Sequence, residues 1–143
     1  MVDTIKALSL FSIIDGTAYP TFGSRPLPII GYDKLYTEVI KYFITEEGSD
    51  IFDKEFGTSL LTLINKGGDE LFIEEVIDSS MAKTRQFFAT KEENALLEGS
   101  PLDPSEALLV FELISFETEV DILNVYVRIA NKLGENKVVR IIV

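Results

Sequence analysis

The stretch 45-TEEGSDIFDKEFGTSLLTLI-64 decides how the chain is interpreted. It places Gly48 and Gly57, a run of acidic residues and two phenylalanines between segments with helical periodicity. A stretch of this kind could be an active-site loop, a phosphate-binding or calcium-binding loop, or a structural connection. Composition and the flanking residues favour the structural connection.

The composition excludes several kinds of chemistry. The chain has 143 residues, of which 46% are hydrophobic, which suits one compact domain over residues 1–143. It has no cysteine, so disulfides and thiolate metal sites are excluded, and no histidine, the commonest general base. Any catalysis would depend on carboxylates, lysine or tyrosine.

The formal net charge of −11 argues against nucleic-acid and membrane partners. Nucleic-acid-binding proteins and proteins that bind anionic lipid surfaces usually display a basic patch, and none is evident. No apolar run approaches the roughly 20 residues that span a bilayer. The first residues carry only Lys6 as a positive charge, and Thr17-Ala18 is a poor cleavage site, so we expect a cytoplasmic, unprocessed chain.

The positive charge is concentrated at the C-terminal end. Residues 122–143 hold four basic residues and one acidic residue in an otherwise acidic chain. One interpretation is that the two ends face different partners. The other is ordinary scatter of surface charge.

The spacing of apolar residues predicts an α+β fold. Residues 1–30 contain several prolines and glycines and predict an extended arm with one short strand near Leu8–Ile14. Residues 31–98 predict two to three helices: one ended by Gly48 in the left-handed conformation, a short one over Ser59–Asn65, and one capped by Asp69.

Beyond residue 98 the periodicity changes to two. Asp103 can cap a single helical turn, after which apolar, β-branched and aromatic residues dominate 108–117, 122–131 and 138–143. Residues 107–143 are therefore expected to form an antiparallel three-stranded β-meander.

The opening stretch does not fit a ligand-binding loop. Gly48 and Gly57 are too far apart for a phosphate cradle, and the surrounding acids would repel phosphate. Apolar Ile51 and Phe52 stand where a calcium loop needs oxygen ligands. The structural interpretation is that Phe52 and Phe56 anchor the loop to the core, while Gly57 allows a tight entry to the next helix.

The same residues resemble a known family. The elements from about Gly31 to Val143 follow the order seen in the baseplate wedge and sheath-initiator family of contractile phage tails and type VI secretion systems, the "lysozyme-like" baseplate proteins. The family motif, an amphipathic helix, T-x-x-G, a short loop, [FY]-G-x-x-[LI] and a second helix, is matched by Thr45, Gly48, Phe56, Gly57 and Leu60. The family's usual Glu-Pro-Arg docking triplet is absent from residues 83–108, so no docking residue is assigned.

The resemblance implies a structural protein without cofactors, metals or catalytic residues. It would lie in the tail baseplate of a virion after assembly in the host cytoplasm. Its partners would be the tail sheath protein, other wedge subunits and the tail tube, with several copies in a ring. Its role would be to offer a sheath-like β-sheet edge from which sheath assembly starts.

The C-terminal strand is the expected sheath-facing edge, because no residue follows it to cover it. The alternative is an interior strand of this domain. The residues concerned are Lys137, Val138, Val139, Arg140, Ile141, Ile142 and Val143.

Two other classes of function stay open. A peptidoglycan hydrolase would need two carboxylates at a defined separation, and the candidates are Glu46, Glu47, Glu74 and Glu75. These occur as adjacent pairs at predicted helix ends, and the chain has no tryptophan platform for a glycan, so we expect no enzyme. An acidic protein-binding adaptor would also fit the composition.

Overall fold

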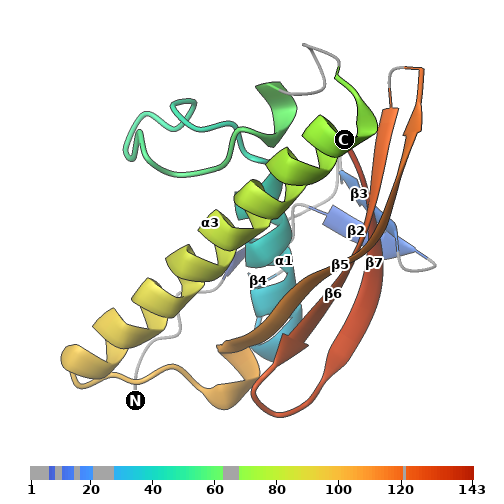
Figure 1. Cartoon of the computed structure of the whole chain (residues 1–143). Helices are drawn as coiled ribbons and strands as arrows, with labels where there is room; N and C mark the ends of the chain where they lie inside the picture. Colours follow the sequence, from blue (N-terminus) through green and yellow to red (C-terminus); the bar gives the residue numbers. More distant parts are fainter. Residues whose placement is uncertain (1–6, 9–10, 15–16, 21–27, 63–67, 121) are drawn as a thin grey trace.

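The computed structural model describes residues 7–8, 11–14, 17–20, 28–62, 68–120 and 122–143, and places side chains from residue 30 onward (Figure 1). The fold is α+β, with helices followed by an antiparallel three-stranded sheet, as the sequence predicts. The elements are β1 (Ala7–Leu8), β2 (Phe11–Ile14), β3 (Thr17–Pro20), β4 (Pro28–Ile29), α1 (Gly31–Ile44), α3 (Glu70–Leu97), the 3₁₀ turn η1 (Pro104–Glu106), β5 (Leu108–Glu119), β6 (Ile122–Asn131) and β7 (Asn136–Ile142). Residues 60–62 are also helical, and the rest of the predicted helix Ser59–Asn65 lies largely outside the described residues.

Helix α1 is capped by a residue distant in sequence. Its N-cap position, Ile30, offers no side-chain hydrogen bond. Instead, the Gly31 amide donates to Glu106 Oε1 at 3.2 Å and Lys34 Nζ donates to Glu106 Oε2 at 3.3 Å. A carboxylate at this end of a helix satisfies free N–H groups and complements the helix dipole. The turn η1 thereby fixes the start of α1.

Helix α1 ends earlier than the sequence predicts. Thr45 has extended backbone geometry, and its amide still bonds back to the carbonyls of Lys41 and Tyr42. Gly48 does have a positive φ of 90°, but it lies in a turn beyond the helix. The prediction that Gly48 ends the helix is therefore wrong. The polypeptide leaves the helix at Thr45 because that residue pairs with the returning chain.

Helix α3 is long and only partly covered. Asp69 caps it as predicted, since its carboxylate accepts from the Phe72 amide at 2.9 Å. The helix buries one narrow stripe that includes Ile77 and Met81. With 28 residues it is about 42 Å long, and Figure 1 shows its C-terminal turns extending past the sheet.

The predicted meander is confirmed, and other strands extend its sheet. Strand β6 pairs antiparallel with both β5 and β7. The full order is β2-β3-β7-β6-β5, with β3 parallel to β7 and Thr17 opposite Arg140. Strands β1 and β4 form a separate antiparallel pair. The single strand expected near Leu8–Ile14 is instead two strands, β1 and β2, in different sheets.

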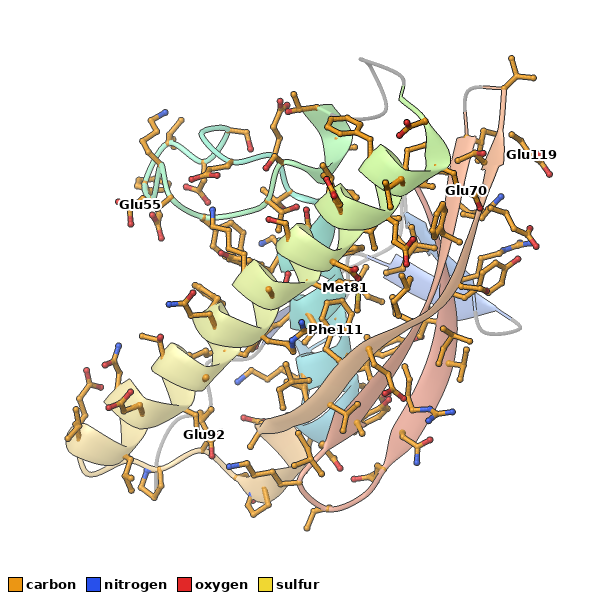
Figure 2. All side chains as sticks on the ribbon, in the orientation of Figure 1. Glu55, Glu70, Met81, Glu92, Phe111 and Glu119 are labelled. Atoms are coloured by element: carbon orange, nitrogen blue, oxygen red, sulfur yellow. The ribbon has the colours of Figure 1, made fainter. Side chains whose placement is uncertain are left out.

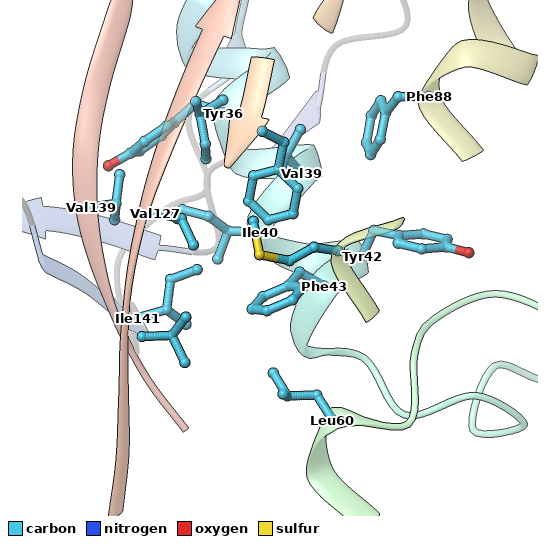
Figure 3. Close-up of a cluster of buried hydrophobic side chains, with 14 of the residues drawn as sticks. Tyr36, Val39, Ile40, Tyr42, Phe43, Leu60, Phe88, Val127, Val139 and Ile141 are labelled. Carbon is cyan, nitrogen blue, oxygen red and sulfur yellow. The ribbon is translucent and has the colours of Figure 1, made fainter. Parts of the chain in front are cut away.

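The core lies between α1, α3 and one face of the sheet (Figure 3). Phe43 of α1 meets Phe111 of β5 edge-to-face, with ring centroids 5.4 Å apart. Burying apolar surface of this kind is the main stabilising contribution to folding. The residues with no more than 1% of their surface exposed include Leu35, Tyr36, Val39, Ile40, Phe43, Leu60, Ile77, Met81, Phe111, Val125, Val127, Ile129 and Val139.

Candidate functional site

The loop between α1 and the next helical residues is closed at its base by the backbone. The Thr58 amide donates to the Thr45 carbonyl at 2.8 Å, and the Glu47 amide donates to the Thr58 carbonyl at 3.0 Å. Gly57 enters this junction with a φ of 107°, and a Cβ there would lie 2.4 Å from the Thr45 oxygen. Only glycine fits such a position without displacing backbone.

Four of the five motif residues meet at this junction. Thr45 and Gly57 form its backbone contact, while Phe56 and Leu60 pack on the core on either side of Gly57. Gly48 is separate, with no atom within 4 Å of a Cβ built on it. The motif spacing therefore has a physical basis in closing a loop between two helices.

One of the two predicted aromatic anchors is correct. The Phe56 ring lies edge-to-face against Tyr42, at 4.9 Å, and against Phe87, at 5.5 Å. Phe52, in contrast, has 93% of its surface exposed, so the prediction that it anchors the loop is wrong. Asp50 and Asp53, on either side of Phe52, accept backbone hydrogen bonds that turn the chain, which directs Phe52 away from the core.

The acids nominated for hydrolysis do not come together in an enclosed cleft. Glu46 accepts from the Thr62 hydroxyl at 3.1 Å, and Glu47 forms an ion pair with Lys83 of α3 at 3.0 Å. Glu74 and Glu75 lie exposed in the first turns of α3, where acids complement the helix dipole. Local stabilisation accounts for the position of each pair.

Strand β7 is an inner strand of the sheet. It lies between β6 and β3, so the expectation that nothing covers its edge is wrong at Arg140, where Thr17 pairs with it. The end of the chain is not the edge of the sheet because the chain's first strands return beside it. Of the residues predicted to face the sheath, Val139 and Ile141 are buried in the core, Arg140 and Val143 are partly buried, and Lys137, Val138 and Ile142 are exposed.

The positive charges of the C-terminal strands are largely balanced by acids of other elements. Arg128 pairs with Glu112 across strands at 2.8 Å. Lys132 pairs with Glu92 of α3, and Lys137 approaches Asp33 of α1 at 4.0 Å. Because these basic residues are paired with acids, ordinary scatter of surface charge explains residues 122–143 better than a separate basic face. Exposed pairs of this kind contribute little to stability.

Strand β5 forms the outer edge of the sheet on the side away from β3. Near its start the edge is protected: Arg85 of α3 donates to the Phe111 carbonyl at 2.7 Å, and the pairing with β6 shifts register on either side of Phe111. Such devices discourage unwanted pairing. The second half, residues 114–119, is mostly exposed, with Phe116 alone partly buried.

Two buried tyrosines on α1 were not singled out by the sequence. The Tyr32 hydroxyl donates to the Ile129 carbonyl at 2.7 Å, and burial raises the Tyr32 pKa to about 12. The Tyr36 hydroxyl is buried without a partner among the described residues, and burial raises its pKa further. Both occur in the apolar stripe of α1, so only their phenol oxygens distinguished them from ordinary core residues.

Surface cavities occur beside α1 and beside α3. One, of about 510 Å³, lies at the start of α1, next to Tyr32, Asp33 and Lys137. Another, of about 300 Å³, lies beside the end of α3, next to Glu93, Leu96 and Leu102. Over the part of the chain that the structure describes, no cluster of acids is arranged to hold a metal ion, and no helix could cross a bilayer.

Comparisons with known proteins identify no relative. No family model matches the chain, and searches of curated proteins and of solved structures find no similar protein. The fold and the site therefore define an α+β protein with a closed interhelical loop and an open sheet edge, and its function is argued from these features.

Proposed function

We propose that this protein is a structural component of the baseplate of a contractile injection machine, where it starts sheath assembly. Its partners would be the tail sheath protein, neighbouring wedge subunits and the tail tube, and several copies would form a ring. Of residues 1–30, expected as an extended arm, strand β3 pairs with β7, so this part would complete the sheet of the protein itself. The protein would lie in the virion tail after assembly in the host cytoplasm.

The observation that carries the proposal is the junction between Thr45 and Gly57. The family resemblance rests on a short motif, and four of its five residues meet at this junction, where the close approach of Gly57 to Thr45 requires the glycine. The order of elements after the motif, a helix followed by a three-stranded meander, also agrees with the family pattern. This supports the resemblance from which the function is inferred.

The edge offered to the sheath is best assigned to β5. A strand can add only where backbone N–H and C=O groups are free, and β7 has neighbours on both sides. Residues 114–119 lie on the outer edge beyond the contact that Arg85 makes with Phe111. A sheath strand added there would continue the meander.

The test uses two single variants, Glu117→Pro and Thr118→Pro, at adjacent positions of β5. Successive N–H groups of a strand point to opposite sides, so one of these prolines removes a donor from the free edge and the other from the pairing with β6. The chain is produced with the tube and sheath proteins encoded beside its gene, and particles are examined by electron microscopy.

The expected result is that one variant keeps its thermal stability and yields baseplates with bare tubes, while the unsubstituted protein yields sheathed tubes. If every proline variant that remains folded supports normal sheaths, β5 is not the starting edge. If the gene has no tube and sheath genes near it, or the protein does not enter tail particles, the baseplate function is contradicted. Peptidoglycan cleavage by the purified protein that Glu46→Gln and Glu47→Gln abolish would favour the hydrolase instead.

A further inference from the structure

The tip of the interhelical loop carries two large apolar side chains that the fold does not use. Ile51 has 76% of its surface exposed and Phe52 has 93%. They stand next to each other, far from the sheet edge discussed above; Figure 2 marks this loop at Glu55, on the opposite side of α3 from the sheet in that view. Scattered exposed apolar residues are common, but an adjacent pair at a loop tip is a typical binding anchor.

The loop behind this tip is held in one conformation. Asp50 Oδ1 accepts from the amides of Phe52, at 2.8 Å, and Asp53, at 3.2 Å. Asp53 Oδ1 accepts from the Glu55 amide at 3.0 Å. Lys83 of α3 donates to the Glu55 carbonyl at 3.2 Å, which ties the loop to the helix. An anchor on a fixed loop loses little conformational freedom when it binds.

The charge around the tip defines the complementary surface. Five acids, Glu46, Glu47, Asp50, Asp53 and Glu55, stand within a few residues of Phe52 along the chain. Against them stand Lys54 in the same segment and Lys83 of α3, which pairs with Glu47, so the loop remains acidic. Backbone hydrogen bonds from Phe52 and Asp53 lower the pKa of Asp50, which favours its charged form. A membrane with anionic headgroups would repel such a tip.

We propose that Ile51 and Phe52 dock into an apolar pocket with a basic rim on a different protein. A second copy of this chain fits less well, because its described lysines and arginines are mostly paired with its own acids. Phe52 is the anchor that fills the pocket, and the surrounding carboxylates set its orientation through lysine or arginine on the rim. The sheet edge stays free for another partner.

The first experiment identifies the partner by photo-crosslinking in cells that produce the full chain. Phe52→p-benzoylphenylalanine is compared with Leu97→p-benzoylphenylalanine, an equally apolar position on α3 with 77% of its surface exposed. The expected result is one dominant adduct from position 52, absent from position 97, whose crosslinked segment carries apolar residues and several lysines or arginines. No adduct above the control, or an adduct to a second copy of this chain, overturns the proposal.

The second experiment measures the affinity of the purified pair. Phe52→Ala is expected to weaken binding about 30-fold or more, as anchor residues do, while Leu97→Ala has no effect. Binding also weakens when the ionic strength rises from about 0.1 M to about 1 M, because the carboxylates contribute. The proposal is contradicted if Phe52→Ala and the unsubstituted protein bind with equal affinity, or if the affinity does not fall at high salt. The proposal is also contradicted if uncharged lipid vesicles bind this protein more strongly than the crosslinked partner protein does.

Discussion

Replacing Gly57 with alanine tests the physical basis of the interhelical junction. The residue has a φ of 107°, in a region that residues with a side chain adopt only with strain of about 1–3 kcal/mol. The added Cβ would also lie 2.4 Å from the Thr45 oxygen and 3.0 Å from the Thr45 carbonyl carbon. These are backbone atoms, so the clash cannot be relieved by rotating a side chain.

The loop segment after Gly57 must therefore move, and the backbone hydrogen bonds of this segment are lost. The bonds of Thr58 to Thr45 and of Glu47 to Thr58 contribute about 0.5–1.5 kcal/mol each. With the strain at Gly57, the free energy of unfolding should fall by about 2–6 kcal/mol. Native domains of ordinary stability have only about 5–15 kcal/mol in total, so the effect is large.

Gly48→Ala is the matched control for this prediction. Gly48 also has a positive φ, of 90°, but no atom lies within 4 Å of its added Cβ. Gly48→Ala should therefore introduce only the backbone strain, which lowers the free energy of unfolding by about 1–3 kcal/mol. Urea unfolding followed by circular dichroism gives both values. If Gly57→Ala costs no more than Gly48→Ala, the close approach to Thr45 does not determine the need for glycine.

Three further predictions concern the core. Tyr32→Phe should destabilise the protein by about 1 kcal/mol by removing the bond to Ile129, whereas Tyr36→Phe should be neutral or stabilising, because its hydroxyl has no partner among the described residues; the opposite order in urea unfolding would contradict this. Burial raises the pKa of Tyr32 from 10.0 to about 12, so its contribution to stability is fully present below about pH 10 and is lost as the pH rises toward 12. The free energy of unfolding, measured at increasing pH over this range, should therefore fall less in Tyr32→Phe than in the unsubstituted protein. Ile141→Ala should cost about 2–5 kcal/mol and Ile142→Ala, with 42% of its surface exposed, far less; equal losses would show that β7 is not a core strand.

Periodic segments of the chain were predictable because local patterns determine them. The strands Leu108–Glu119 and Ile122–Asn131 match the predicted ranges closely, and the helix Gly31–Ile44 has the predicted apolar stripe although it ends before Gly48, since each element buries one face against the same core. The caps at Asp69 and Asp103 were also predictable, because a cap acts over two or three residues. Each of these features depends on neighbours in sequence.

Features that depend on distant residues were not predictable. The cap of α1 comes from Glu106, 75 residues beyond Gly31, and no local pattern at Ile30 indicates it. The direction of Phe52 depends on two aspartates that turn the backbone, although its spacing from Phe56 is that of two residues on one helix face. A residue type that favours the core was therefore assigned to the core, and the structure places it at the loop tip.

The position of β7 follows from the same limitation and has consequences for function. A sequence shows which strand ends the chain, but the edge of a sheet depends on which strands pair, and Thr17 is 123 residues before Arg140 in the chain. Because β7 has two neighbours and buries Val139 and Ile141, deleting it should unfold the core rather than only block a partner. A surface for assembly must then be sought where backbone groups or side chains are free. Among the described residues, two such places are the outer half of β5 and the loop tip at Phe52, and they lie on different elements, so two partners could bind at the same time.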